Sequence, residues 1–227
     1  MKKTIILILF TALFAFGSNS LDESFVSFGI EGGVEKNSVL YKMVSDKDID
    51  KRQKEFFKQT ILKNKTNYLT AKRVLEEKGV PLSFLWIAMT ESKFNAATSS
   101  RRARHVGVWQ MASYSSKMFG LKASKGSDER RNVEKSTAAF ADYCHYMHKE
   151  FKNWSVVALA YNCGDDRLKK VIRKAGTNDL NTILSPNKKL LSKTSKTYFK
   201  RVMTLSAIAN DDEIKEFLTN LENGEKG

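Results

Sequence analysis

Apolar residues recur at α-helical spacing along most of this chain, and that periodicity restricts the fold more than any other feature of the sequence. It is clearest in residues 136–151 and in the segment that follows them. The apolar positions there are Phe140, Cys144, Met147, Phe151, Trp154, Val157, Ala158 and Tyr161. The 227 residues also contain only 2 Pro and 12 Gly, whereas an all-β sandwich needs a turn about every ten residues. We therefore expect an all-α fold.

The same criterion predicts helices on both sides of this region. Charged and apolar residues alternate at helical spacing from Asp46 to Glu77, which predicts one or two amphipathic helices that end at Lys78-Gly79. The apolar positions of this stretch are Phe56, Ile61, Leu62, Tyr68, Leu69, Val74 and Leu75. The segment from Leu82 to Glu91 is apolar on nearly every face, so we expect a helix that is buried all round. A last helix is expected from Tyr198 to Ala209.

These patterns divide the chain into four expected parts. Residues 1–20 begin with Lys2-Lys3, continue with a short apolar run and end in small residues, which is the layout of a secretory signal peptide. The alternative for this segment is an uncleaved N-terminal anchor. Residues 21–62 are expected to form a partly helical N-terminal extension and residues 63–210 the main domain, with an acidic tail at 211–227.

The charge of the chain is strongly basic. The formal net charge is +14, and residues 21–210 alone carry +16, because Lys2 and Lys3 lie outside them and the last 17 residues hold six acidic side chains against two lysines. A charge of this size attracts polyanions. Export favours anionic cell-wall polymer or lipid headgroups over nucleic acid as the partner, and no nucleic-acid-binding motif is present. The alternative is that the charge only keeps the protein soluble.

Glu91 is the candidate catalytic residue. It stands at the end of the apolar helix, where a carboxylate is poorly solvated, and desolvation favours the protonated form of a carboxyl group. A carboxyl whose pKa is raised in this way can donate a proton near neutral pH. The alternative is a helix-terminal glutamate that turns into solvent.

Three short blocks surround this candidate in a specific order. They are Glu91-Ser92-Lys93-Phe94-Asn95, Gly107-Val108-Trp109-Gln110 and Ala160-Tyr161-Asn162-Cys163-Gly164. The chain thereby resembles the bacterial lytic transglycosylases, enzymes with a lysozyme-like (SLT) domain that cleave peptidoglycan, and in particular the membrane-bound murein transglycosylase D type. The connecting segments 119–121, 128–137 and 195–200 are similar to the family as well, so the resemblance covers residues 79–209.

The resemblance implies a role for each matching residue. Glu91 would be the sole acid/base: it would protonate the glycosidic oxygen between N-acetylmuramic acid and N-acetylglucosamine. It would then accept the proton of the muramoyl 6-hydroxyl, so that a 1,6-anhydro product forms. The substrate-binding residues implied are Ser100 (with Ser99 as its alternative), Gln110, Tyr161, Asn162 and Tyr198. The family needs no metal and no organic cofactor, and we expect none here.

The spacing of the acidic residues fits this chemistry. An ordinary glycosidase uses two carboxylates that flank the scissile bond, but no Asp or Glu occurs between Ser92 and Ser127. Four later residues remain candidates for a second carboxylate, namely Asp128, Glu129, Asp165 and Asp166.

Cysteines and histidines offer two further sites. Cys144 and Cys163 fall at similar heights in an expected antiparallel helix pair and would lie in an oxidising compartment, so they form either a disulfide or two free thiols. His145 and His148 lie three residues apart on one helix but have no third ligand at a fitting spacing, so we expect no metal site.

The sequence thus predicts a lytic transglycosylase of the periplasm or cell envelope whose partner is the glycan strand of peptidoglycan. Peripheral contact with the membrane and association with cell-wall, secretion or motility machinery are left open. Two other functions are also left open: a non-catalytic peptidoglycan-binding protein on the same scaffold, and a muramidase that uses water as the acceptor.

Overall fold

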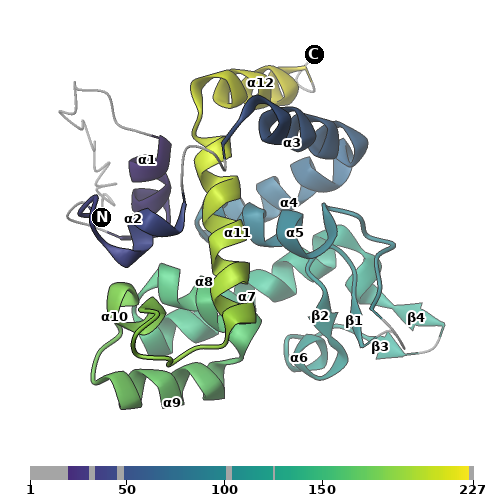
Figure 1. Ribbon diagram of the computed structural model, residues 1–227. Helices are drawn as coiled ribbons and strands as arrows, with labels where there is room; N and C mark the ends of the chain where they lie inside the picture. The colour runs from purple at the N-terminus through teal and green to yellow at the C-terminus, as the bar shows by residue number, and fades with distance from the viewer. Residues whose placement is uncertain (1–19, 31–33, 45–48, 101–103, 125, 225–227) are drawn as a thin grey trace, which may run out of the picture.

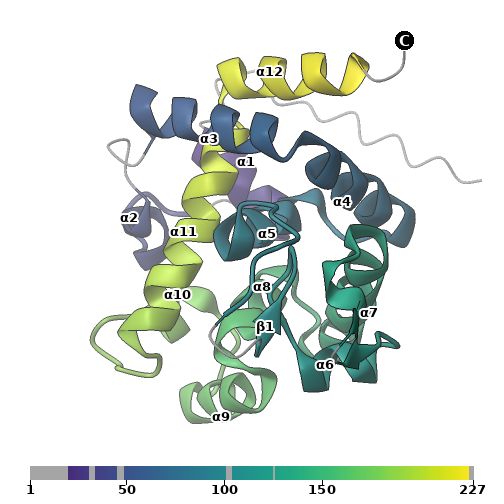
Figure 2. The same cartoon turned by 90° about the vertical axis from the view of Figure 1, so that its right-hand side faces the viewer.

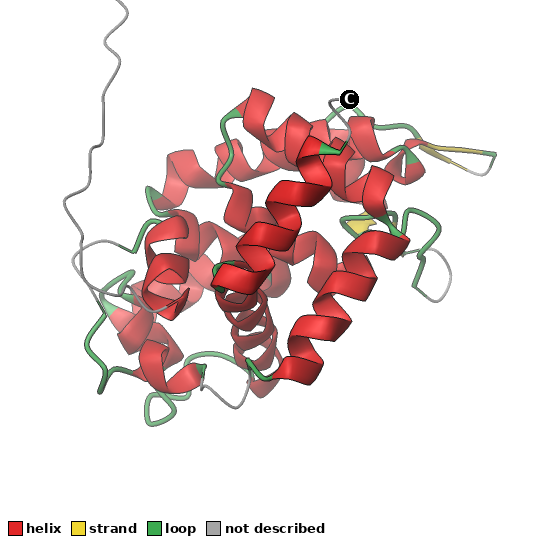
Figure 3. Ribbon diagram, turned by 90° about the horizontal axis from the view of Figure 1, so that it is seen from above, coloured by secondary structure: helices red, strands yellow, loops and turns green. Residues whose placement is uncertain are grey.

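The computed structural model describes residues 20–30, 34–44, 49–100, 104–124 and 126–224. The expected signal peptide, apart from Ser20, lies outside the described residues. Within them, α-helices supply nearly all of the regular structure, and the two sheets are short and two-stranded (Figure 3). The expectation of an all-α fold is confirmed.

Helix α11 (Lys193–Ala209) forms the centre of the molecule, and the other helices surround it (Figure 1). It packs against α1 (Ser20–Ser27), α5 (Leu85–Ser92) and α8 (Trp154–Cys163), and its side chains at Phe199, Val202 and Met203 are buried. The helix begins five residues before the predicted start, because the Ser192 hydroxyl accepts a hydrogen bond from the Ser195 amide and caps it.

The N-terminal extension belongs to the same core. The helices of this region are α1, α2 (Val39–Met43), α3 (Lys51–Lys63) and α4 (Lys65–Lys78). Leu21, Phe25 and Phe28 are buried, and α1 lies along α11. Helix α4 ends at Gly79 as predicted, since Gly79 adopts φ +66°, a conformation that glycine reaches without strain.

The prediction for α3 was wrong at two positions. Phe56 and Leu62 were assigned to the apolar face, but they are 46% and 47% exposed. The buried face of α3 is formed by Phe57, Thr60 and Ile61 instead. An adjacent apolar pair such as Phe56-Phe57 leaves the rotation of a helix undecided in the sequence, and only the neighbouring helices fix it.

Most of the expected acidic tail is helix α12 (Asp212–Asn223), which packs against α3 (Figure 2). Ile214 is buried, and two acidic side chains pair with lysines of α3. These ion pairs are Lys54–Asp211 at 2.7 Å and Lys58–Glu213 at 2.9 Å. The acidic segment is therefore docked on the basic body of the protein.

The remaining elements lie between α4 and α11 in the sequence. They are the 3-10 helices η2 (Leu82–Phe84), which leads into α5, and η4 (Glu129–Arg131); the strands β1 (His105–Val106), β2 (Met111–Ala112), β3 (Ala123–Ser124) and β4 (Ser127–Asp128); and the helices α6 (Ser113–Met118), α7 (Val133–Phe151), α8, α9 (Asp165–Ala175) and α10 (Leu180–Leu184). Strands β1 and β2 pair antiparallel, as do β3 and β4. Two-residue strands carry no periodic pattern, so the sequence did not predict them.

Cys144, Cys163, His145 and His148 were the further candidates for a disulfide or a metal site. Cys144 is buried, Cys163 is partly exposed, and both are free thiols, so the disulfide is absent from this structure. The His148 ring stacks on Trp154 with 4.0 Å between ring centroids, and a ring nitrogen of His145 is hydrogen-bonded to the Lys78 carbonyl at 2.7 Å.

None of the described helices combines the length and the apolar character needed to cross a bilayer.

Candidate active site

Helix α5 carries Glu91 to the edge of the core. The residues before it, Leu85 to Met89, are buried, while Glu91 in the last turn is half-buried. Lys93 ends the helix with φ 57°. The buried hydroxyl of Ser92 donates a hydrogen bond to the Val108 carbonyl oxygen at 2.7 Å. The end of α5 is thereby fixed to the segment that leads into β2.

A cavity of about 450 Å³ opens beside Glu91, and in Figure 2 the end of α5 and strand β1 face the viewer. We call it the Glu91 cavity. The residues that line it are Glu91, Ser100, His105, Gln110, Met111, Ala112, Ser115, Tyr143, Tyr161 and Asn162. Glu91 and all of the predicted substrate-binding residues except Tyr198 therefore line the same cavity.

Burial changes the acidity of Glu91. Desolvation raises the pKa of this carboxyl above its ordinary value, and an interaction with the Tyr198 hydroxyl lowers it in part. The raised pKa is the direction that a general acid requires near neutral pH.

Tyr198 belongs to α11 and lies next to Glu91. Its side chain is 8% exposed, and burial raises the pKa of its hydroxyl well above the ordinary value, with the neighbouring Glu91 charge acting in the same direction. The hydroxyl interacts with Glu91 electrostatically but is not in full hydrogen-bond geometry with any described residue. A buried hydroxyl in this state is a donor ready for the carboxylate or for a bound ligand.

Tyr161 connects the cavity to the core. Its hydroxyl donates to the Trp109 carbonyl oxygen at 2.5 Å, and its ring meets Phe140 edge-on. Trp109 itself is fully buried, stacks on Phe140 with 3.7 Å between centroids and donates from its indole nitrogen to Thr137. Because these contacts fix its ring, Tyr161 presents a rigid aromatic wall beside Glu91.

Gln110 and Ser100 are held by the backbone of the same loop. The Gln110 amide nitrogen donates to the carbonyl oxygens of Thr98 and Gly107 at 3.1 and 2.8 Å. The amide oxygen is therefore the group of Gln110 that can accept a hydrogen bond from a ligand. The Ser100 hydroxyl accepts from the His105 amide at 2.9 Å, and the hydroxyl proton remains for donation.

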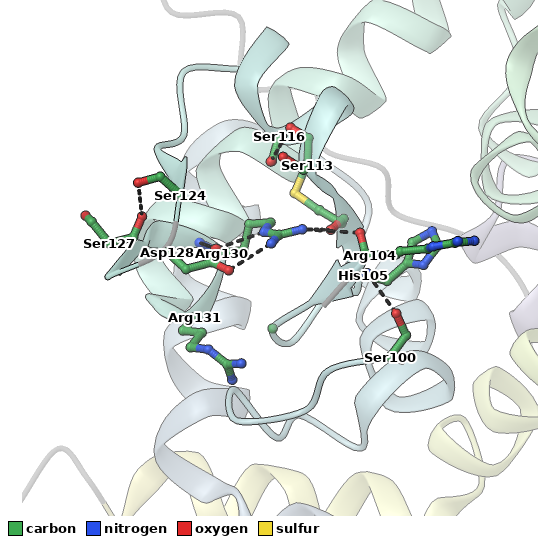
Figure 4. A network of polar contacts seen from close by, with 12 residues as sticks. Ser100, Arg104, His105, Ser113, Ser116, Ser124, Ser127, Asp128, Arg130 and Arg131 are labelled. Atoms are coloured by element: carbon green, nitrogen blue, oxygen red, sulfur yellow. Dashed lines mark hydrogen bonds and ion pairs between the residues drawn. The ribbon is translucent and has the colours of Figure 1, made fainter. Parts of the chain in front are cut away.

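A buried arginine, Arg130, supports the loop that carries Ser100 and Gln110 (Figure 4). The Arg130 guanidinium is 4% exposed and forms a two-point contact with Asp128, at 2.8 Å for each nitrogen. It also donates to the carbonyl oxygens of Met111 and Arg104 at 3.0 and 3.3 Å. Arg131 donates to the Ala97 carbonyl at 2.7 Å. The loop that carries Ser100 and Gln110 is thus anchored to η4.

The candidate second carboxylates do not reach the Glu91 cavity. Asp128 is occupied by Arg130, which is the main cause of its lowered pKa. Glu129 pairs with Lys135 at 2.7 Å. Asp165 and Asp166 begin α9, outside the cavity lining. Among the described residues, Glu91 is the only carboxylate that lines this cavity.

Five of the lining residues were not predicted as site residues, namely His105, Met111, Ala112, Ser115 and Tyr143. His105 begins the two-residue strand β1, which carries no periodic pattern. Tyr143 lies beside the apolar stripe of α7, and its ring meets Tyr161 edge-on at 5.6 Å. The helical pattern of apolar residues includes its neighbour Cys144 but not Tyr143. Periodicity therefore did not indicate that Tyr143 would reach the cavity.

The fold and the site define an all-α domain with a cavity that, among the described residues, is lined by one carboxylate, the half-buried Glu91. The model of the family described as "Transglycosylase SLT domain" matches residues 70–184, which is half of the chain. The chain belongs to this family.

Individual relatives agree with the family match. Membrane-bound lytic murein transglycosylase D of Escherichia coli (strain K12) is 31% identical over 101 residues, which are 44% of this chain and 22% of the relative. A protein of Alteromonas sp. (strain M-1) described as a tributyltin chloride resistance protein is 30% identical over 99 residues, 43% of this chain and 47% of its own length. The chain therefore spans about a fifth of the first relative and about half of the second.

A solved structure gives the same fold. An inactive mutant of the lytic transglycosylase Slt from Pseudomonas aeruginosa superposes with a TM-score of 0.51 and 18% sequence identity, over 64% of this chain and 24% of that chain. At this level of identity the match supports the arrangement of the helices.

Proposed function

We propose that this protein is a lytic transglycosylase that cleaves the β-1,4 bond between N-acetylmuramic acid and N-acetylglucosamine in peptidoglycan and leaves 1,6-anhydro-muramoyl ends. The observation that carries the proposal is the isolation of Glu91. It is the only carboxylate lining the cavity among the described residues, and its pKa is raised by burial. A single carboxyl that works as acid and then as base matches a reaction whose acceptor is a hydroxyl of the substrate itself.

The proposed reaction has two proton transfers. Protonated Glu91 donates its proton to the glycosidic oxygen as the bond from the muramoyl anomeric carbon to that oxygen breaks. The carboxylate then accepts the proton of the muramoyl 6-hydroxyl as its oxygen bonds to the anomeric carbon. Glu91 ends as it began, protonated, and no water is consumed. Gln110, Asn162 and Ser100 would hold the sugars by hydrogen bonds, and Tyr161 would supply an apolar wall.

The cell envelope is the proposed location, since peptidoglycan is found there. The proposal is supported by the sequence layout of residues 1–20.

Digestion of purified murein sacculi tests the proposed function. We expect the protein to release muropeptides whose muramoyl ends are in the 1,6-anhydro form, which mass spectrometry identifies because they lack one water relative to the reducing ends. Reducing ends would instead identify a muramidase. Binding to sacculi without release of muropeptides would identify a wall-binding protein on the same scaffold.

Replacement of Tyr198 by Phe is predicted to change the pH dependence of this activity. The Tyr198 hydroxyl lowers the pKa of Glu91, so its removal should raise that pKa further. Activity that needs protonated Glu91 is lost as the pH rises through its pKa. The alkaline limb of the kcat/KM profile should therefore move to higher pH in Tyr198→Phe.

Tyr143→Phe is the matched control for this measurement. Tyr143 lines the same cavity, but it is not among the groups that shift the pKa of Glu91. Its removal should leave the alkaline limb in place. An alkaline limb that is unchanged, or lower, in Tyr198→Phe would contradict the electrostatic role assigned to Tyr198.

A further inference from the structure

Half of the net positive charge of residues 21–210 lies in one short stretch of the chain. Residues 167–196 contain nine Lys or Arg and a single acidic residue, Asp179, so they carry +8 of the +16. Asp179 is occupied locally, because its carboxylate accepts hydrogen bonds from the amides of Asn181 and Thr182 at the start of α10. No described residue of this stretch lines the Glu91 cavity. The proposed reaction therefore leaves this charge without a role.

The fold brings the exposed cations of this stretch to one end of the molecule. In Figures 1 and 2, α9 and the link between α10 and α11 lie at the lower end, whereas α3 and α12 lie at the upper end. Leu168 and Val171 of α9 are buried, so the cations of this helix face outward. We call the exposed cations of α9, of the link and of the first turn of α11 the basic end. They are Lys170, Arg173, Lys174, Lys188, Lys189 and Lys193.

The charge of the basic end is not compensated by ion pairs. Within the described ranges, none of its members pairs with an acidic side chain, whereas their neighbour Lys169 lies 3.8 Å from Glu150. Asp165 and Asp166 lie in the first turn of α9, before the first cation of the basic end. Cations that gather on one surface without acidic partners produce a positive potential that attracts anions.

The composition of the basic end indicates which anion it fits. Residues 167–196 contain no Phe, Tyr or Trp, so they offer no ring on which the bases of a single-stranded nucleic acid could stack. The cations come from a helix and from a separate link, so they form a surface rather than a line along one polymer strand. A bilayer with anionic phospholipid presents many phosphate groups in one plane and attracts clustered Lys and Arg.

We propose that the basic end docks the protein on the surface of a bilayer that contains anionic phospholipid. Its ammonium and guanidinium groups contact the headgroup phosphates, and no helix has to enter the hydrocarbon. At the opposite end of the molecule, α12 exposes Asp212 and Glu216, which an anionic surface repels. The protein therefore binds the surface in one orientation, with α9 toward the lipid and α12 away from it.

Sedimentation of the full chain with lipid vesicles tests this proposal. One set of vesicles contains phosphatidylglycerol and phosphatidylcholine in equal parts, and the other contains phosphatidylcholine alone. We expect tighter binding to the anionic set. The difference should disappear when the salt concentration is raised from about 0.1 M to about 1 M, since the Debye length then falls from roughly 10 Å to roughly 3 Å. Binding to the neutral set measures the contribution of the apolar residues near the N-terminus.

A triple variant locates the binding surface. Lys170→Gln, Arg173→Gln, Lys174→Gln removes three exposed cations of α9. The Kd for the anionic vesicles should rise about a hundredfold, since each cation near an anionic bilayer contributes a factor of about five. Binding to the neutral vesicles should not change.

The matched control is Lys51→Gln, Arg52→Gln, Lys63→Gln, which removes the same charge from exposed positions of α3, at the other end of the molecule. It should leave the Kd for the anionic vesicles unchanged. Equal losses in the two triple variants, or equal binding of the unmodified protein to both sets of vesicles, would overturn the inference. Soluble polyphosphate that binds more tightly than the vesicles, and only in the presence of the α9 cations, would assign the basic end to an anionic polymer instead.

Discussion

Glu91→Gln should lower kcat for murein cleavage by about a thousandfold, because a positioned general acid contributes roughly 10²- to 10⁴-fold. The amide keeps the size of the side chain but can neither donate the proton to the leaving oxygen nor accept one from the 6-hydroxyl. No other described carboxylate lines the cavity to replace it. The release of anhydro-muropeptides from sacculi, followed by mass spectrometry, measures the effect.

Glu77→Gln is the matched control. Glu77 is an exposed carboxylate of α4 that pairs with Arg73 at 2.8 Å, and such exposed pairs contribute little. Its replacement should leave kcat unchanged. Retention of more than about a tenth of the activity in Glu91→Gln would contradict the assignment of Glu91 as the acid.

Glu91→Gln should also change the stability of the protein in a pH-dependent way. The pKa of Glu91 is raised in the folded state above the unfolded value of 4.5. Its contribution to stability is therefore fully present below that unfolded value and is lost as the pH rises through the folded pKa. Glu91→Gln should consequently raise the Tm relative to the unmodified protein at pH 8, with a smaller difference at pH 4. An inactive variant with a higher Tm at pH 8 would also show that the loss of activity does not come from unfolding.

Gly107→Ala should destabilise the protein by more than about 4 kcal/mol, enough to lower the Tm by about 10 °C or to prevent folding. Gly107 has φ +83°, and a Cβ at this position would overlap the carbonyl oxygen of Arg130. The backbone cannot withdraw easily, since the Gly107 amide donates to the Thr98 carbonyl at 2.9 Å. Thermal unfolding followed by circular dichroism measures the change.

Gly120→Ala separates the two causes of this effect. Gly120 has φ +84°, nearly the same as Gly107, but no atom lies within 4 Å of the position a Cβ would occupy. Alanine there should cost only the strain of the left-handed conformation, about 1–2 kcal/mol. Similar losses in the two variants would show that the contact with Arg130 is unimportant.

The candidate site illustrates how far the sequence reaches. The helix of Glu91 was predictable because it is apolar on nearly every face, and the order of the three blocks indicated which residues would accompany Glu91. The support for the site was not predictable. The sequence contains no local sign that Arg130 would be buried and would bind the carbonyl oxygen of Met111, since that contact joins segments 19 residues apart.

The errors have a common physical origin. Helical spacing identifies a helix but not the rotation at which it packs, so Phe56 was assigned to the core although it borders a cavity. Composition identifies acidic residues but not their partners, so the sequence did not indicate that Lys54 and Lys58 would hold the acidic segment after Asn210 against α3. Both decisions depend on contacts between helices.

The sequence by itself determined the helical class of the fold, through apolar residues at a period of 3.6, and the position of the single carboxyl of the site, through Glu91 and its neighbouring blocks. Tertiary structure alone decided that, among the described residues, Glu91 is the only carboxylate lining its cavity, and that the Tyr198 hydroxyl partly offsets the rise in the Glu91 pKa caused by burial. Local preferences are set by residues a few positions apart. Burial and charge proximity are set by segments that meet only when α5, α11 and the 95–112 loop pack together.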